Sequence, residues 1–166
     1  MTALIVMACS GKKHPGAERM PAIDRYQGPM WGTLRAALNE LGEAEKPEVW
    51  FLSAKYGFHP ASLGILDYEQ KLTEHRARDL LSNPNSNWRE FAQAAHSMDR
   101  IMLAGGFVYR DAMRRAIGKL PMQGASPLIA ETDGGGIGHH RAQLRQWISG
   151  VAEASAKGEP EQLSLF

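Results

Sequence analysis

Polar or glycine-rich turns follow four short apolar segments of the chain. The turns cover residues 10–13, 55–57, 105–106 and 134–138. Lysine side chains, serine hydroxyls and exposed main-chain amides at such turns can bind phosphate or another anion. Glycine is common wherever a strand turns into a helix, but four turns of this kind together favour one shared pocket.

Asp67 is the candidate acid or base, because it follows the 55–57 turn by ten residues and could reach the same pocket. Its carboxylate could orient water or stabilise a positively charged, sugar-like transition state. Tyr56 or Tyr68 could stack on a nucleobase. A carboxylate that caps a turn or a helix would have the same sequence, so both interpretations of Asp67 stay open.

The glycine loop at 134–138 precedes a predicted helix that begins at His139. Main-chain amides and a helix N-terminus there could hold a phosphate, although the spacing matches neither the Walker nor the Rossmann motif. Lys12 and Lys13 could add positive charge or could simply be solvated loop residues. His139 and His140 would point about 100° apart on a helix. We therefore favour a neutral histidine that donates to phosphate over a metal ligand.

Composition excludes several classes of protein. The chain has 166 residues, of which 43% are hydrophobic and 22% charged, as is typical of a single soluble globular domain. Its formal charge of +1 gives no global attraction to nucleic acid or to an anionic membrane. Cys9 is the single cysteine, so an internal disulfide and a multi-cysteine zinc site are excluded, and packing is its more common role. The opening apolar run is too short for a signal or membrane segment, so we expect a cytoplasmic protein.

Apolar runs alternate with helical patterns along the chain. Expected strands cover 2–8, 48–54, 100–104 and 127–131, and expected helices cover 30–41, 76–81, 88–98, 107–117 and 139–151. This order predicts one α/β domain over 1–151, with a mainly parallel sheet of about four strands and helices on both faces. Ligands of such sheets bind at the carboxyl ends of the strands. We therefore expect Lys12, Lys55, Asp67 and the 134–138 loop around a single cavity.

The last five residues, 162–166, follow a small and polar stretch at 152–161 that we expect to be a flexible linker. Exposed leucine and phenylalanine side chains need a partner groove. All five positions resemble the bacterial sliding-clamp-binding motif, which implies clamp contacts through Gln162, Leu163, Leu165 and Phe166. The alternative is a tail that folds back on its own domain. Attachment to a clamp would raise the local concentration at DNA to roughly millimolar and offset the low net charge.

Three segments carry a wider resemblance: ACSGKK at 8–13, AIDRYQGPMW at 22–31 and LSAKYGFHPASLGILDYEQKL at 52–72. Over roughly residues 3–148 the chain resembles a family of bacterial and phage proteins with a Cys-Ser-Lys, Tyr, Leu-Ser-Ala-Lys-Tyr/His-Gly and Asp/Tyr pattern. That family is distantly similar to the YaaA peroxide-stress DNA-binding proteins, although this chain shows no clear helix-hairpin-helix segment. The resemblance implies nucleobase chemistry, including that of glycosylases which act on modified bases in anti-phage defence. The positions it implies are Cys9, Ser10, Lys12, Tyr26, Ser53, Lys55, Tyr56, Gly57, Asp67 and Tyr68.

These observations together predict a DNA glycosylase, or a related base-processing enzyme of repair or anti-phage defence, that needs no cofactor. Asp67 would act on water or on the sugar, and Lys55 would form a Schiff base only if its pKa were depressed. Further substrate-binding candidates are Gly105, Gly136, Gly138 and His139. Two alternatives stay open: a nucleoside or nucleotide deoxyribosyltransferase, and a non-catalytic protein that binds DNA or the clamp.

Overall fold

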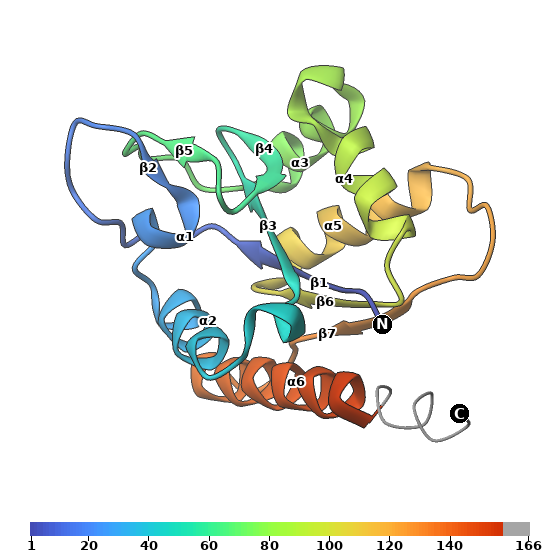
Figure 1. Ribbon diagram of the computed structural model, residues 1–166. Helices are drawn as coiled ribbons and strands as arrows, with labels where there is room; N and C mark the ends of the chain where they lie inside the picture. Colours follow the sequence, from blue (N-terminus) through green and yellow to red (C-terminus); the bar gives the residue numbers. More distant parts are fainter. Residues whose placement is uncertain (158–166) are drawn as a thin grey trace.

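The computed structural model describes residues 1–157 and contains a five-stranded sheet with the order β4-β3-β1-β6-β7 (Figure 1). The parallel strands are β1 (Ala3–Ala8), β3 (Glu48–Ser53), β6 (Arg100–Ala104) and β7 (Leu128–Glu131). A further strand, β4 (Gly57–Pro60), pairs antiparallel with β3 at one edge. The prediction of a single α/β domain with a mainly parallel sheet is confirmed.

Strand β1 lies in the middle of the sheet and is buried on both faces. Leu4 and Val6 belong to the core on one face, whereas Ile5 and Met7 belong to the core on the other. Burial on both sides explains why the sequence of this strand is continuously apolar rather than alternating.

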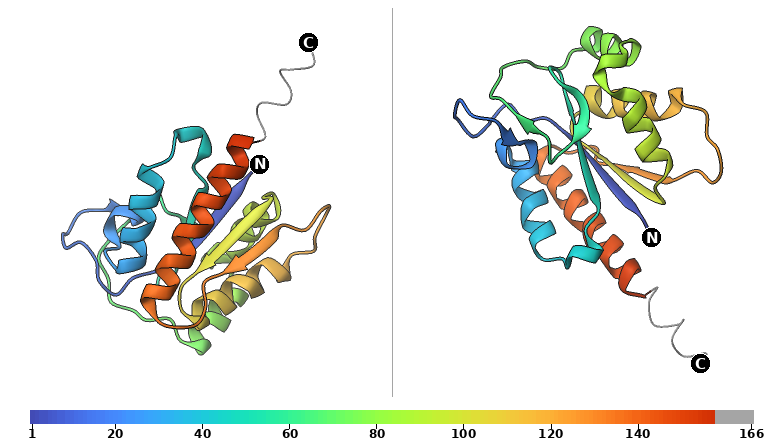
Figure 2. Two further views of the ribbon diagram at one scale, coloured as in Figure 1. Left: turned by 90° about the horizontal axis from the view of Figure 1, so that it is seen from below. Right: turned by 45° about the horizontal axis from the view of Figure 1, so that its top comes forward.

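The helices form one layer on each face of the sheet (Figure 2). One layer consists of α2 (Pro29–Asn39) and α6 (Ile137–Lys157), which lie side by side. The other consists of α3 (Glu74–Ser82), α4 (Trp88–His96) and α5 (Phe107–Lys119). Each layer buries an apolar stripe against the strands, as parallel sheets require.

Several small elements join the main strands and helices. Helix α1 (Ala22–Arg25) adjoins a two-stranded pair made of β2 (Met20–Pro21) and β5 (Gly64–Ile65). Two short 3₁₀ helices are η1 (Glu43–Glu45) and η2 (Pro84–Ser86). The buried Arg25 guanidinium donates to the main-chain oxygens of His14 at 2.6 Å and Ile65 at 3.3 Å. This arginine therefore ties the loop after β1 to the segment after β4.

Helix α6 is longer than the sequence indicated. Its predicted span of 139–151 is too short, since the helix begins at Ile137 and continues to Lys157. Residues 152–157 of the predicted linker are therefore helical, and the rest of that linker and the clamp-like tail at 162–166 lie outside the described residues. None of the helices described within 1–157 has both the length and the apolar character needed to cross a membrane.

Candidate functional site

The chain leaves β1 and β6 in opposite directions across the sheet. β1 is followed by α2 and then β3 on one side, whereas β6 is followed by α5 and then β7 on the other. Open α/β sheets bind ligands at such a reversal, at the carboxyl ends of the strands. A cavity of about 360 Å³ lies there, which is large enough for a small ligand.

Mostly apolar side chains and main-chain atoms form the walls of this cavity. Trp31 is fixed by a hydrogen bond from its Nε1 to the main-chain oxygen of Ala8 at 2.9 Å. Polar side-chain atoms come from Cys9, Ser10, Tyr109 and His140. The lining residues are Ala8, Cys9, Ser10, Gly28, Pro29, Met30, Trp31, Ala104, Gly105, Gly106, Tyr109, Gly136, Ile137 and His140.

Three helices begin at this cavity. Gly28, Gly106 and Gly136 directly precede α2, α5 and α6, and all three glycines line the cavity. The first turn of a helix has N–H groups without intrahelical acceptors, and the helix dipole makes this end positive. The convergence of three such ends favours an anionic group in the cavity.

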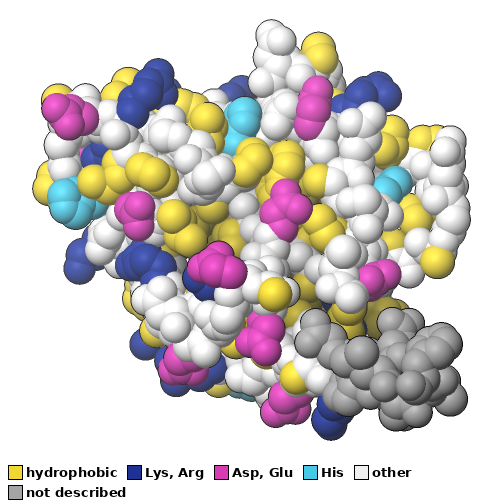
Figure 3. Space-filling view, viewed as in Figure 1, with side chains coloured by type: hydrophobic (Ala, Val, Ile, Leu, Met, Phe, Trp, Pro, Cys, Tyr) yellow, Lys and Arg dark blue, Asp and Glu magenta, His cyan; other side chains and the backbone are white. Residues whose placement is uncertain are grey.

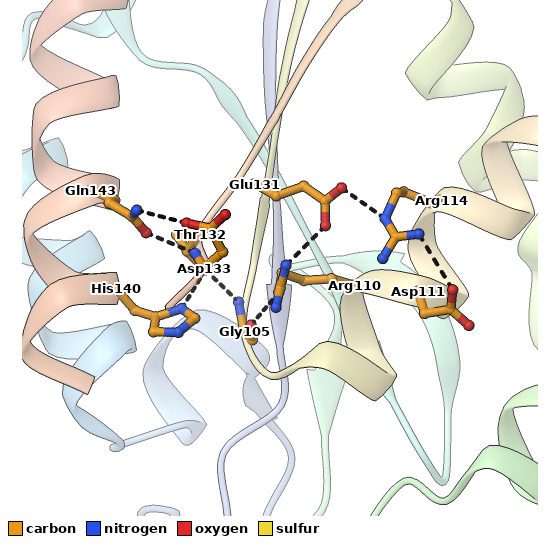
Figure 4. Close-up of polar contacts among 9 residues, drawn as sticks. All are labelled: Gly105, Arg110, Asp111, Arg114, Glu131, Thr132, Asp133, His140 and Gln143. Atoms are coloured by element: carbon orange, nitrogen blue, oxygen red, sulfur yellow. Dashed lines mark hydrogen bonds and ion pairs between the residues drawn. The ribbon is translucent and has the colours of Figure 1, made fainter. Parts of the chain in front are cut away.

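His140 supplies a polar side chain to the cavity from the first turn of α6. Its Nδ1 lies 2.7 Å from Oγ1 of the buried Thr132, which also accepts a hydrogen bond from the Gly105 N–H at 3.1 Å (Figure 4). Burial of the ring, assisted by the charge of Arg110, lowers the pKa of His140 below its ordinary value. The ring is therefore neutral at neutral pH.

A second hollow of about 340 Å³ adjoins the first. It is lined by Cys9, Ser10, Gly11, Lys13, Glu69, Gln70, Lys71 and Tyr109. Cys9, Ser10 and Tyr109 line both hollows, so the two are adjacent and together form the cleft considered below. The Tyr109 hydroxyl lies 3.2 Å from Cys9 Sγ and accepts from the Leu72 N–H at 3.3 Å. Burial raises the pKa of Tyr109, so its hydroxyl stays protonated.

A cluster of buried tyrosine side chains packs against Lys13, which lines the second hollow. The hydroxyls of Tyr26 and Tyr68 are 2.6 Å apart, and Ser53 Oγ donates to Tyr68 at 2.7 Å. Burial raises the pKa of both tyrosines. The Tyr68 side chain lies under Lys13 Nζ, 4.4 Å from the ring centroid, and the residue is only 8% exposed. This leaves little of the ring for stacking on a nucleobase. Tyr56, whose hydroxyl accepts from the Leu66 N–H at 3.2 Å, also serves the packing of this cluster.

Lys12, Lys55, Asp67 and the 134–138 loop were expected around a single cavity, and only part of this set is found there. Of its four groups, only the glycine loop lines the main cavity, through Gly136. Lys12, Lys55 and Asp67 are exposed and line neither hollow. Their positions near the same sheet edge did not determine where their side chains point.

Three other predicted residues have local roles. His139 is exposed and contacts Gln143 Nε2 at 3.3 Å, so His140 occupies the place expected for His139. Gly138 lines a separate hollow with Arg141 and Arg145. Gly57 has a φ of +81°, and a Cβ there would come within 2.2 Å of the Ser86 main-chain oxygen, so its role is to let the chain pass closely.

Several cavity residues were not predicted from the sequence. Met30 and Trp31 follow the spacing of a core helix, and Tyr109 lies within an ordinary helical pattern. The pair Gly28-Pro29 was the available signal, because a glycine before a proline is typical of a helix start and hence of a possible anion site.

Within residues 1–157, His, Cys, Asp and Glu side chains form no group of three or more that could hold a metal ion. No family model, curated protein or solved structure matches this chain. Function is therefore inferred from the geometry of the cleft.

Proposed function

We propose that the protein binds a nucleotide unit of DNA in the cavity between β1 and β6 and hydrolyses the N-glycosidic bond of its base. The observation that carries this proposal is the combination of an apolar wall with three helix N-termini in one cavity. The half-buried Met30 and the exposed Ile137 offer apolar surface for a flat base, whereas the helix ends attract a phosphate. A nucleotide unit has both of these parts.

The second hollow supports a polymer as the substrate rather than a free nucleoside. It adjoins the main cavity at Cys9 and Ser10, and Lys13 and Lys71 place positive charge along it. Acidic and basic side chains are interspersed on the face drawn in Figure 3, in agreement with the low net charge. Attraction to a DNA strand would therefore be local, through lysines such as these.

None of the described residues that line the main cavity is acidic, so the carboxylate that we propose comes from the adjoining hollow and is Glu69. It lines the second hollow, whereas Asp67 lines neither hollow. In the reaction, the oxygen of water bonds to the anomeric carbon, the electrons of the carbon–nitrogen bond go to the base, and the base takes up a proton. A carboxylate can accept the proton of water or stabilise the positive charge on the sugar. We therefore assign to Glu69 the role that the sequence suggested for Asp67.

Two isosteric variants test this assignment. Glu69→Gln and Asp67→Asn each remove one charge from the same segment, so each is the control for the other. We expect Glu69→Gln to lower base release by roughly a hundredfold, the scale of one positioned acid–base or electrostatic group, and Asp67→Asn to act like the wild type. Released base and alkali-labile sites would be measured on single- and double-stranded oligonucleotides that carry modified or unmodified bases.

Each outcome of this experiment separates the candidate functions. A loss of activity in Asp67→Asn alone would return the catalytic role to Asp67. Base exchange between free nucleosides without DNA would support a deoxyribosyltransferase. DNA binding without base release by the wild type, on every substrate, would leave a non-catalytic DNA-binding protein and overturn the proposed hydrolysis.

A further inference from the structure

Thr132 connects two walls of the main cavity. It follows β7 directly, and its buried hydroxyl lies between the Gly105 N–H of the turn after β6 and Nδ1 of His140 on α6 (Figure 4). The two distances are 3.1 Å and 2.7 Å. Thr132 therefore contacts both the floor of the cavity and its histidine without lining the cavity itself.

The direction of these hydrogen bonds follows from the groups involved. The Gly105 N–H can only donate, so Thr132 Oγ1 accepts from it. The hydroxyl hydrogen of Thr132 then needs an acceptor, because a buried hydroxyl without a partner is costly. Nδ1 of His140 is the acceptor within reach. A neutral imidazole that accepts at Nδ1 carries its proton on Nε2.

We propose that Thr132 holds His140 in the Nε2–H tautomer and thereby makes it a neutral hydrogen-bond donor for a phosphate oxygen in the cavity. Among the described residues 1–157, no side chain forms a hydrogen bond with Nε2, and His140 lines the cavity; the main-chain oxygen of Gly134 also lies near the ring. Gly136 and Ile137, at the start of α6, line the same cavity as His140. The positive end of the helix favours an anionic acceptor over the carbonyl group of a base. The phosphate part of the inference rests on the proposed nucleotide ligand, whereas the tautomer part does not.

The tautomer can be measured directly. In protein labelled with ¹⁵N at histidine, the chemical shifts of the two ring nitrogens distinguish the Nε2–H from the Nδ1–H form, and His140→Gln identifies the His140 signals by their loss. We expect Nε2–H in the wild type and in Thr132→Ser, which keeps the hydroxyl. Thr132→Val removes the donor to Nδ1, so we expect a mixture of tautomers. An Nδ1–H form in the wild type would overturn the proposal, even if the valine variant failed to fold.

Ligand binding tests the phosphate assignment separately. Affinities for deoxyadenosine 5′-monophosphate and for deoxyadenosine would be measured by calorimetry. We expect His140→Gln to weaken binding of the monophosphate about tenfold, roughly the contribution of one hydrogen bond to a charged group, and to leave the nucleoside unchanged. The exposed neighbour provides the control, since His139→Gln should change neither affinity. An equal loss for the nucleoside would contradict the phosphate assignment.

These two measurements also separate this inference from the proposed hydrolysis. The Nε2–H tautomer with tight monophosphate binding but no base release would refute the glycosylase activity and leave the inference intact. Base release together with an Nδ1–H tautomer would support the glycosylase activity and refute the inference about His140.

Discussion

Gly105 has no room for a side chain at the floor of the main cavity. A Cβ there would lie 2.4 Å from the Cβ of Ala8, and its φ of +141° is rarely adopted by other residues. Its N–H donates to Thr132, and its oxygen accepts from Arg110 Nε at 2.8 Å. Arg110 in turn pairs with Glu131, which also pairs with Arg114 (Figure 4). One glycine thus joins the ends of β1, β6 and β7.

Substitution of this glycine should destabilise the protein. We expect Gly105→Ala to lower the free energy of unfolding by about 2 kcal/mol, because the added methyl group overlaps Ala8 and the backbone angle is unfavourable. Gly106→Ala is the matched control, since a Cβ at Gly106 meets no atom within 4 Å and its φ of −67° is ordinary. Its effect should stay within about 0.5 kcal/mol. Equal effects of the two variants in urea denaturation would contradict this account.

Sequence patterns located the turns of the site but not the direction of its side chains. The prediction named His139, whereas His140 lines the cavity. The spacing along α6 was the better signal, since His140 lies four positions before the buried Leu144 and therefore on the same face of the helix. Similarly, Asp67 and Glu69 lie two positions apart in an irregular segment, where no periodicity indicates which carboxylate faces the cleft.

Elements were predicted well where burial covers both faces of a strand. The apolar runs of β1, β3 and β6 identified these strands, whereas the four-residue β4 was missed. Strand β4 begins at Gly57, ends at Pro60 and lies at the sheet edge, where proline is tolerated because an edge N–H needs no partner. The last part of α6 was also missed, because alanine and glutamate were interpreted as a linker although both favour helices.

Helix α6 is held against the sheet by a short apolar stripe. Leu144, Ile148 and Val151 are its buried residues, spaced by four and then three positions. We expect Leu144→Ala to lower the free energy of unfolding by about 3 kcal/mol, because it removes a fully buried side chain next to the sheet. The neighbouring Arg145 is exposed, so Arg145→Ala should change stability by less than about 0.5 kcal/mol. Thermal denaturation of both variants, compared at the wild-type midpoint, provides the measurement.

The whole molecule combines a structured domain with a clamp-like end that lies outside the described residues. If 162–166 binds the sliding clamp, its deletion should abolish clamp binding and leave activity on short DNA unchanged. We expect Leu165→Ala and Phe166→Ala each to weaken binding by about 2 kcal/mol or more, because a few apolar anchors dominate such peptides. Glu159→Ala, placed before the motif, is the control. Clamp binding that survives the deletion, measured by surface plasmon resonance, would contradict the tail assignment.

The central position of β1 also affects how the protein is made. This strand is made before the other described strands, yet its partner β6 is far along the chain: Leu4 of β1 pairs with Ile101 of β6, 97 positions later. At a synthesis rate of about 5–20 residues per second, the apolar β1 lacks that partner for roughly 5–20 seconds. Pairings so distant in sequence also slow folding. We therefore expect chaperones to bind β1 during translation, and no nascent chain that ends before His140 contains the complete main cavity.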